Sequence, residues 1–263
     1  MTKPEVPDHE TVHAPHAALP HYYEGEEGRR EFVRQVFDET AGDYDRIEQM
    51  MAFGTGSWYR RRALVRSGLV AGMDVLDVAV GTGLVAREAV RIVGDARKVI
   101  GIDSSIGMLR SASQSLDIVT VQGTAENLPF ASDRFGFLSM GFALRHMSDL
   151  SIVFAEFHRV LKPGGTVCVL EITKPKGPIA RTALKTYLRG LIPLLARFVG
   201  SHRNTAHLFR YFWDTIEACV PPESVIAALR HAGFEDVKRV LEVGIFSEYT
   251  GRKWGGPGAG ARS

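Results

Sequence analysis

Short apolar runs alternate with amphipathic segments through the middle of this 263-residue chain. Runs rich in branched and aromatic side chains predict strands, and they lie at 73–79, 97–103, 117–122, 134–141 and 165–172. Segments with the 3.6-residue period of a helix lie between several of these runs, at 84–93, 105–115 and 149–161. Strands and helices that alternate at this spacing predict an α/β fold with a doubly wound, Rossmann-like, mostly parallel sheet.

Helical patterns precede this alternation. Apolar positions from Arg29 onward recur at helical intervals and predict two helices with a break near Ala41-Gly42. A further helix is expected from Trp58 to about Ser67. We interpret residues 29–68 as a helical lid on the sheet.

An apolar and basic helical insert interrupts the alternation at 175–220. A helix at 223–232 and two strands within 235–250 follow it, which brings the expected sheet to seven strands. One domain therefore spans 29–253. Residues 1–28 and 254–263 lack apolar periodicity, so we expect both ends to be flexible tails.

The apolar run that includes Asp77 leads directly into a glycine turn, Ala79-Val80-Gly81-Thr82-Gly83. About 20 residues later, the next apolar run ends at Asp103. Strand, glycine turn, helix, strand and acid in this order are typical of a site for a ribose-bearing cofactor. Glycine lets the backbone approach the ligand, and the carboxylate can accept both ribose hydroxyls.

Two details favour S-adenosylmethionine over a dinucleotide as this cofactor. The dinucleotide fingerprint Gly-x-Gly-x-x-Gly is incomplete, because the turn begins with Ala79 and because Ala86 stands three residues after Gly83, where the third glycine would be. Asp77 would repel a pyrophosphate, whereas its charge suits the ammonium group of a methionine-like tail. The alternative interpretation is an ordinary strand-to-helix turn that binds no ligand.

Composition narrows the class of protein. Thirty-two basic and 30 acidic residues nearly balance, so nothing in the charge calls for a nucleic acid partner. Cys168 and Cys219 have neither metal-ligand nor disulfide spacing, and we expect Cys168 to be a buried apolar residue. No apolar run reaches about 20 residues, and no signal peptide pattern opens the chain. We expect a cytoplasmic protein with at most peripheral contact with the inner membrane.

Histidines gather near the start of the chain, at His9, His13, His16 and His21. Their spacing defines no helical face, and no second group of ligands accompanies them. We therefore expect them to lie in the solvated tail, and we expect no metal site.

Several motifs resemble those of class I S-adenosylmethionine-dependent methyltransferases: Val75–Gly83, Asp103–Leu109 and Glu126–Phe130. Further stretches narrow the resemblance to the ubiquinone/menaquinone C-methyltransferases of the UbiE/COQ5 group: Arg159–Gly165 followed by Leu170–Pro175, and Phe142–His146. Residues 32–253 share in the resemblance, which includes an N-terminal signature from Val36 to Trp58.

The resemblance implies a set of cofactor contacts in addition to Asp77. The methionine tail would lie on Ala79, Gly81, Thr82 and Gly83, the ribose on Asp103 beside Ser104, and the adenine near Met108, Thr124 and Ala125, with Gly141 beneath the sulfonium. Two alternatives stay open. Met108 can pack in the core, and Asp103 can cap a helix.

The resemblance also implies methylation of a carbon on a phenolic or quinol-like ring, a small aromatic acceptor. Arg145 would stabilise the phenolate, and His146, at a position where the family usually has asparagine, has an intrinsic pKa suited to a general base. Tyr44 would bond the cofactor carboxylate or the acceptor oxygen. The alternatives are that Arg145 pairs with Asp149, that the His146 ring faces solvent, and that Tyr44 only packs the lid.

Departures from the family pattern gather on the lid and acceptor side, at Ile47-Glu48, Thr124 and Ile245–Tyr249. They indicate a relative that acts on a different acceptor, for example a non-prenylated one. O- or N-methylation of a small natural product or a lipid head group is the alternative, and a non-catalytic binding module is a third possibility. The apolar face over Leu184–Val199 favours a roof over the acceptor pocket or a homodimer contact rather than a membrane surface, because Pro193 interrupts it.

Overall fold

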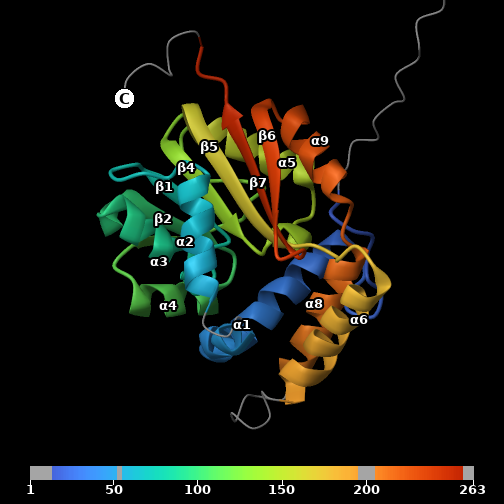
Figure 1. Ribbon diagram of the computed structural model, residues 1–263. Coiled ribbons are helices and arrows are strands. Elements are labelled where there is room, and N and C mark those ends of the chain that lie inside the picture. The colour runs from blue at the N-terminus through green and yellow to red at the C-terminus, as the bar shows by residue number, and fades with distance from the viewer. Residues whose placement is uncertain (1–13, 52–54, 195–204, 257–263) are drawn as a thin grey trace, which may run out of the picture.

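One seven-stranded sheet organises the chain, whose computed structural model describes residues 14–51, 55–194 and 205–256 (Figure 1). The strand order is β3-β2-β1-β4-β5-β7-β6. The bounds are β1 Val75–Val78, β2 Val99–Asp103, β3 Val119–Gln122, β4 Phe135–Gly141, β5 Leu161–Ile172, β6 Phe234–Glu242 and β7 Phe246–Lys253. Strands β1 to β5 are parallel, and β7 runs antiparallel to both β5 and β6. The predicted doubly wound, mostly parallel sheet is confirmed.

Helices cover both faces of the sheet. One face carries α2 (Gly56–Arg66), α3 (Leu84–Val93) and α4 (Ile106–Ser115), and the other carries α5 (Leu150–Val160) and α9 (Pro222–His231). The two groups lie on opposite faces because the chain moves outward from β1 in one direction and then returns to β4 with right-handed crossovers throughout. Short 3-10 turns, η1 (Ala96–Lys98) and η2 (Leu144–His146), connect helices and strands at the edges of the sheet.

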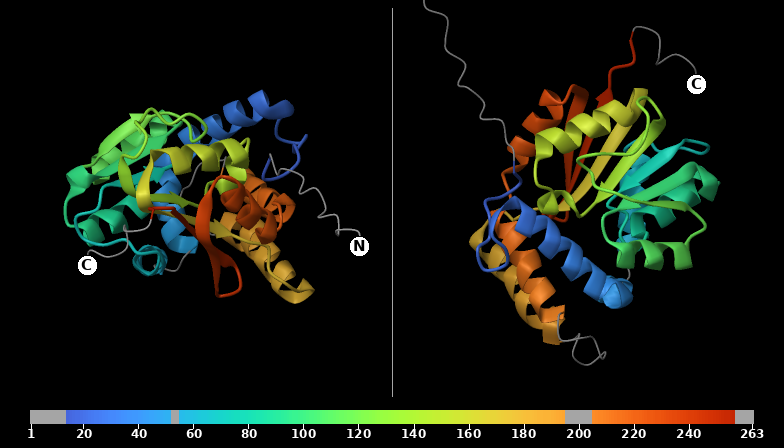
Figure 2. Two further views of the ribbon diagram at one scale, coloured as in Figure 1. Left: turned by 90° about the horizontal axis from the view of Figure 1, so that it is seen from above. Right: turned by 180° about the vertical axis from the view of Figure 1, so that it is seen from behind.

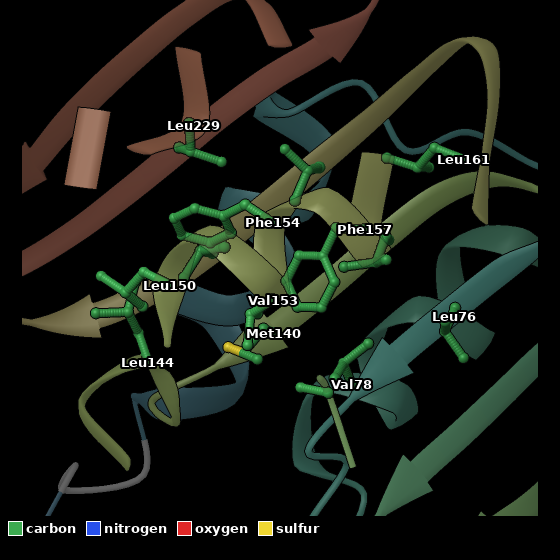
Figure 3. Close-up of a cluster of buried hydrophobic side chains, with 14 of the residues drawn as sticks. Leu76, Val78, Met140, Leu144, Leu150, Val153, Phe154, Phe157, Leu161 and Leu229 are labelled. Carbon is green, nitrogen blue, oxygen red and sulfur yellow. The ribbon is translucent and has the colours of Figure 1, made fainter. Parts of the chain in front are cut away.

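Each face has its own apolar core. Figure 3 shows the larger one, in which Phe154 and Phe157 of α5 and Leu229 of α9 pack on fully buried side chains of the sheet. On the other face, side chains of α2 and α3, among them Leu64 and Ala86, pack against β1 and β2. Strand β1 is therefore buried along its whole length, which explains its continuous apolar run.

The N-terminal helix α1 (Gly25–Met51) is a single helix of 27 residues. The predicted break near Ala41-Gly42 is wrong. Glycine inside a helix costs only about 1 kcal/mol, and burial of Ala41 within α1 helps to offset that cost. Figure 1 shows α1 crossing the sheet at the edge where β1 to β5 end. The lid helix is thus long enough to contact several strand ends at once.

The insert forms helices that pack against α1. It contains α6 (Pro178–Thr186), a π-helical turn η3 (Tyr187–Leu191) and α8 (Thr205–Ala218). We call α1, α6, η3 and α8 the helical layer; Figure 2 shows it apart from the helices that flank the sheet. Its core joins Val36 of α1 to fully buried Phe209 and Trp213 of α8. Residues 195–204 lie outside the described ranges, and with them the last part of the apolar face predicted over Leu184–Val199.

The segment before α1 is packed rather than solvated. Tyr23 and His16 are buried, and the Val220 amide donates a hydrogen bond to the Pro15 carbonyl (2.7 Å). The expectation of a flexible tail up to residue 28 is therefore wrong for residues 14–28. This segment makes its contacts through a few aromatic side chains, and these are too few to produce the periodic pattern from which packing could be predicted. Residues 1–13, including His9 and His13, lie outside the described ranges, as do residues 257–263.

Other expectations concern single side chains. Cys168 is fully buried in β5, as predicted, and its sulfur accepts a hydrogen bond from the Ser67 hydroxyl (3.1 Å). His21 is exposed. Within the described residues, no group of His, Cys, Asp and Glu has the arrangement of a metal site. None of the described helices combines the length and apolarity that a membrane span needs.

Candidate active site

Two adjoining cavities lie where β1, β2 and β4 end beneath α1. The main cavity is lined by nine of the predicted site residues: Tyr44, Ala79, Gly81, Thr82, Asp103, Ser104, Met108, Gly141 and His146. The second cavity shares Ala79, Asp103 and His146 with the first and adds the predicted residues Thr124 and Ala125. The structure thus brings most of the predicted cofactor contacts to one edge of the sheet. Asp77, Gly83 and Arg145 line neither cavity.

The glycine turn after β1 has the backbone shape that its sequence predicts. Gly81 (φ 56°) and Gly83 (φ 90°) lie in the left-handed region, and so does Ala79 (φ 53°), at a cost of about 1 kcal/mol. A side chain at Gly83 would place its Cβ 2.6 Å from Leu116 Cδ1. Gly83 therefore serves the close approach of α3 to the chain after α4, rather than direct contact with a ligand.

Asp103 ties the ends of β1 and β2 together. Its Oδ2 accepts a hydrogen bond from the Gly81 amide (2.8 Å), and its Oδ1 accepts one from the Ser105 amide (2.9 Å). Burial raises the pKa of this carboxyl, although the backbone N–H groups oppose that shift. The helix itself is capped by Ser105, whose hydroxyl accepts from the Met108 amide (3.0 Å). Each carboxylate oxygen of Asp103 keeps a lone pair for a hydroxyl in the cavity.

Asp77 lies beneath the turn. Its Oδ1 accepts a hydrogen bond from the Ser139 hydroxyl (2.6 Å), and the Ala86 amide faces the carboxylate. Its buried Oδ2 has no hydrogen-bond partner among the described residues. Burial raises the pKa of Asp77 to about 7. A buried carboxylate with an orphaned oxygen gains from a cation placed nearby, which fits the ammonium group of a methionine tail.

Two acids of α1 bind the loops that form the cavity, and sequence reasoning missed both roles. Asp38 accepts hydrogen bonds from the Ser105 hydroxyl (2.6 Å) and the Gly107 amide (2.8 Å) at the start of α4. Asp45 accepts a hydrogen bond from the Thr82 hydroxyl in the glycine turn. Acids seven residues apart lie on one face of a helix, and that spacing was the available signal.

Arg145 is buried behind the cavity wall. Its guanidinium is ion-paired with Glu171 of β5, donates to the Phe142 carbonyl (2.9 Å) and lies 5.1 Å from the centre of the Phe212 ring. Arg145 therefore pairs with Glu171 and not with Asp149, which was the alternative from the sequence. Asp149 instead caps α5, where its carboxylate accepts a hydrogen bond from the Ser151 amide (2.8 Å). Sequence reasoning missed the role of Glu171.

His146 lines both cavities and is buried, so the alternative of a solvent-facing ring is wrong. Its Nδ1 lies 3.0 Å from the Tyr211 hydroxyl of α8. Its Nε2 is buried and has no hydrogen-bond partner among the described residues. Burial, reinforced by the nearby charge of Arg145, lowers the pKa of His146 well below its usual value. The ring is therefore neutral at neutral pH.

The lid side of the main cavity is aromatic. Tyr44 lines it with Phe37, whose ring centre lies 6.2 Å away, and burial raises the pKa of the Tyr44 hydroxyl. Phe142 closes the opposite side at a left-handed φ of 60°. Sequence reasoning missed Arg60, a buried lining residue whose guanidinium pairs with Glu48 (2.7 Å) and lies 5.5 Å from the Phe142 ring centre. No motif in the sequence marks it.

S-adenosylmethionine fits these residues. Asp103, a carboxylate that could accept hydrogen bonds from ribose hydroxyls, stands at the end of β2, and the Oδ2 atom of Asp77 has no hydrogen-bond partner among the described residues. Met108 is buried on α4 and also lines the main cavity, so packing in the core does not exclude contact with a ligand there. Thr124 and Ala125 border the adjoining cavity, where an adenine would lie.

Known proteins resemble this chain over most of its length. The model of the ubiE/COQ5 methyltransferase family matches residues 24–253. Ubiquinone/menaquinone biosynthesis C-methyltransferase UbiE of Hahella chejuensis (strain KCTC 2396) is 34% identical over 229 residues, which cover 84% of this chain and 91% of that protein. Demethylmenaquinone methyltransferase of Symbiobacterium thermophilum is 32% identical over 238 residues, 86% of this chain and 94% of that protein.

A solved structure shares the fold. The S-adenosylmethionine-dependent methyltransferase of Thermotoga maritima, described as a possible histamine N-methyltransferase, superposes with a TM-score of 0.58 at 20% identity and covers 84% of this chain and 99% of its own. The matched family model extends from the start of α1 to the end of β7, and the cavity residues lie within that span. This chain belongs to the ubiE/COQ5 methyltransferase family and is an S-adenosylmethionine-dependent methyltransferase.

Proposed function

We propose that this enzyme methylates a ring carbon of a small phenolic, quinol-like acceptor. The observation that carries the proposal is the likeness, over 84% of the chain, to a relative named a ubiquinone/menaquinone biosynthesis C-methyltransferase. The cavity supports it with an aromatic lining, Phe37, Tyr44 and Phe142, suited to a flat ring. His146, whose Nε2 has no hydrogen-bond partner among the described residues, lines the same cavity.

The cofactor would be held at the ends of β1 and β2. Asp103 would accept hydrogen bonds from the ribose hydroxyls, and the negative charge of Asp77 would favour the methionine ammonium from beneath the turn. Met108 and Ala125 would border the adenine. When bound, S-adenosylmethionine would supply an electrophilic methyl group to the acceptor's ring carbon, leaving S-adenosylhomocysteine, and the proton displaced from that carbon would pass to solvent.

The chain's own residues would act on the acceptor's oxygen. Ionisation of a ring hydroxyl increases electron density at the neighbouring carbon, so a group that stabilises the oxygen's negative charge speeds methyl transfer. His146 lines the cavity, and its Nε2 either accepts the hydroxyl proton or donates to the oxygen, depending on which ring nitrogen is protonated. Arg145 would act through the wall, with its charge partly offset by Glu171.

Tyr44 and α1 would close the site. Tyr44 would bond either the acceptor oxygen or the cofactor carboxylate, since it is one of the residues that line the main cavity. Asp38 and Asp45 hold α1 against the start of α4 and the glycine turn. That placement would exclude water from the reacting groups and hold the acceptor in a fixed orientation.

A binding measurement and a product analysis test the proposal. S-adenosylmethionine is titrated by calorimetry into the wild type, Asp103→Ala and the control Asp95→Ala, whose carboxylate is exposed in a surface pair with Arg97. We expect Asp103→Ala to abolish detectable binding and the control to bind normally. The loaded enzyme is then offered hydroquinones, phenols and amines, each with and without a prenyl tail, and NMR locates the new methyl. Methylation on oxygen or nitrogen only would contradict carbon transfer.

A further inference from the structure

Tyr211 and His146 form a buried pair that the reaction described so far does not explain. Tyr211 comes from α8 and His146 from η2, 65 residues apart in the chain. The rings stack with centres 5.3 Å apart and planes at 23°, and the Tyr211 side chain is fully buried. A T-shaped contact with Phe37 of α1 (5.3 Å) holds the imidazole from another side. The ring is therefore fixed by three elements.

The chemistry of the pair indicates where its protons lie. A phenol hydroxyl is a better donor than a neutral imidazole N–H, and an imidazole nitrogen is a better acceptor than a phenol oxygen. The favoured arrangement therefore has the Tyr211 hydroxyl donating to Nδ1, which leaves the single imidazole proton on Nε2. Burial favours the neutral form of the ring, and the electrostatic effects of Arg145, His16 and Arg29 add to that preference.

We propose that Tyr211 is a positioning residue that keeps the His146 proton on Nε2, so that the ring donates a hydrogen bond to the acceptor's ionised oxygen, whose hydroxyl proton passes to solvent water rather than to His146. This inference rests on the proposed function, which places that oxygen in the main cavity. Nε2 is a buried polar atom without a partner among the described residues, and buried polar atoms are rarely left unpaired once a ligand can reach them. The acceptor's oxygen supplies the missing partner.

Two further observations favour a donor over a base. The lowered pKa of His146 makes the ring a weak base, poorly matched to a phenol whose pKa is near 10. Arg145 is already ion-paired with Glu171 and does not line the cavity. A neutral N–H in the wall is thus the donor best placed to polarise the oxygen, as a neutral histidine does in triosephosphate isomerase.

NMR of the cofactor-loaded protein tests the tautomer without any acceptor. Long-range proton–nitrogen correlations of 15N-labelled protein distinguish protonated from bare ring nitrogens, and His146→Asn identifies the His146 signals by their loss. We expect Nε2 protonated and Nδ1 bare in the wild type, and a mixture of tautomers in Tyr211→Phe. Tyr22→Phe is the matched control, since it removes the hydroxyl that donates to Asp214 (2.7 Å) from the same aromatic cluster. A proton on Nδ1 in the wild type would overturn the assignment.

Kinetics test the role of the donor. Tyr211→Phe should lower turnover roughly tenfold, the size of one hydrogen bond, while the dissociation constant of S-adenosylmethionine stays unchanged. His146→Asn keeps a donor but cannot act as a base, so we expect it to stay within about tenfold of the wild type, whereas His146→Ala should lose about 100-fold or more. Equal losses in His146→Asn and His146→Ala would overturn the donor role. If no acceptor is methylated, the proposed function fails, and the NMR result still decides the tautomer.

Discussion

Ionisable side chains at this site are buried, and burial shifts each pKa in the direction that favours the uncharged form of the group. Asp77 and Asp103 have raised pKa values and His146 a lowered one, with desolvation as the largest cause in each case. Buried groups of this kind are costly to the free protein and become favourable when a charged or polar ligand pairs with them. At the scale of single residues, the site is therefore built for a partner with complementary charge.

The pKa of Asp77, about 7, predicts pH-dependent cofactor binding. The pKa of Asp77 in the folded protein lies above its ordinary value of about 3.9. The contribution of Asp77 to the free energy of unfolding is therefore fully present below pH 4 and is lost as the pH rises through 7. The ammonium of S-adenosylmethionine favours the ionised form. We expect affinity, measured by calorimetry, to increase between pH 6 and 7.5 in the wild type. Asp77→Asn should bind about 30-fold more weakly at pH 7.5 and lose this pH dependence; equal affinity in both proteins would make Asp77 purely structural.

The buried pair of Arg145 and Glu171 predicts a non-additive pair of substitutions. Arg145→Met leaves the Glu171 charge unpaired and should lower the free energy of unfolding by about 3–5 kcal/mol. The double variant Arg145→Met/Glu171→Gln buries no charge and should recover most of that loss, as measured by urea unfolding.

The rate of methyl transfer to phenols, measured in the double variant, distinguishes the structural role of Arg145 from its proposed electrostatic role. If Arg145 stabilises the phenolate, the double variant should be folded yet turn over about 100-fold more slowly. Full activity in the double variant would show that the pair serves stability alone.

At the scale of secondary structure elements, α1 connects the other helices of the helical layer to the two loops that line the main cavity, the glycine turn and the start of α4. Its buried residues, such as Val36, pack in the core shared with α8, while Asp38 and Asp45 bind the start of α4 and the glycine turn. A displacement of α1 would therefore disturb both loops together. The same helix also carries Phe37 and Tyr44 into the wall of the main cavity.

This connection predicts that carboxylates of α1 contribute to cofactor affinity. Asp38→Ala removes a cap from α4 and should lower stability by about 1 kcal/mol. Asp38→Ala and Asp45→Ala should each weaken S-adenosylmethionine binding several-fold and speed amide hydrogen exchange in the loops that they hold. Glu39→Ala is the control on the same helix, since Glu39 accepts an exposed hydrogen bond from Gln35 (3.0 Å). If amide hydrogen exchange in these loops were unchanged in both Asp38→Ala and Asp45→Ala, α1 would not be holding the loops in place.

At the scale of the whole molecule, the main cavity, where we propose that the cofactor binds, lies between the sheet and the helical layer. Asp103 ends β2 and the glycine turn follows β1, both on the sheet side, whereas Tyr44 lies in α1 of the helical layer. A ligand between two packed parts stabilises the arrangement that joins them, because it binds only the folded state.

Thermal unfolding should report this stabilisation. At 100 times its dissociation constant, S-adenosylmethionine should add about 2.7 kcal/mol, which raises the melting temperature by about 5–10 °C in a protein of this size. Asp103→Ala should show no shift, and Asp95→Ala should shift like the wild type. A shift in Asp103→Ala as large as in the wild type would mean that the cofactor binds elsewhere.

Local patterns predicted the sheet well and the helical layer less well. A pattern of a few residues is enough to predict a strand such as β1 or a helix such as α5, which has its cap at Asp149. The continuity of α1 and the packing of residues 14–28 depend instead on distant partners. Gly42 predicts a helix break because the free-energy cost of a glycine inside a helix is a local property. The apolar contacts of α1 that offset this cost come from elsewhere in the fold.

By itself, the sequence determined the α/β order, the glycine turn and the acid at Asp103, because each depends on neighbours within one strand–turn–helix unit. It also determined that the carboxyl ends of β1, β2 and β4 would share one edge. Only the tertiary structure decided that Arg145 pairs with Glu171 and that His146 meets Tyr211. Those partners lie 26 and 65 residues apart, and only the packing of β5 and the helical layer around η2 brings them together.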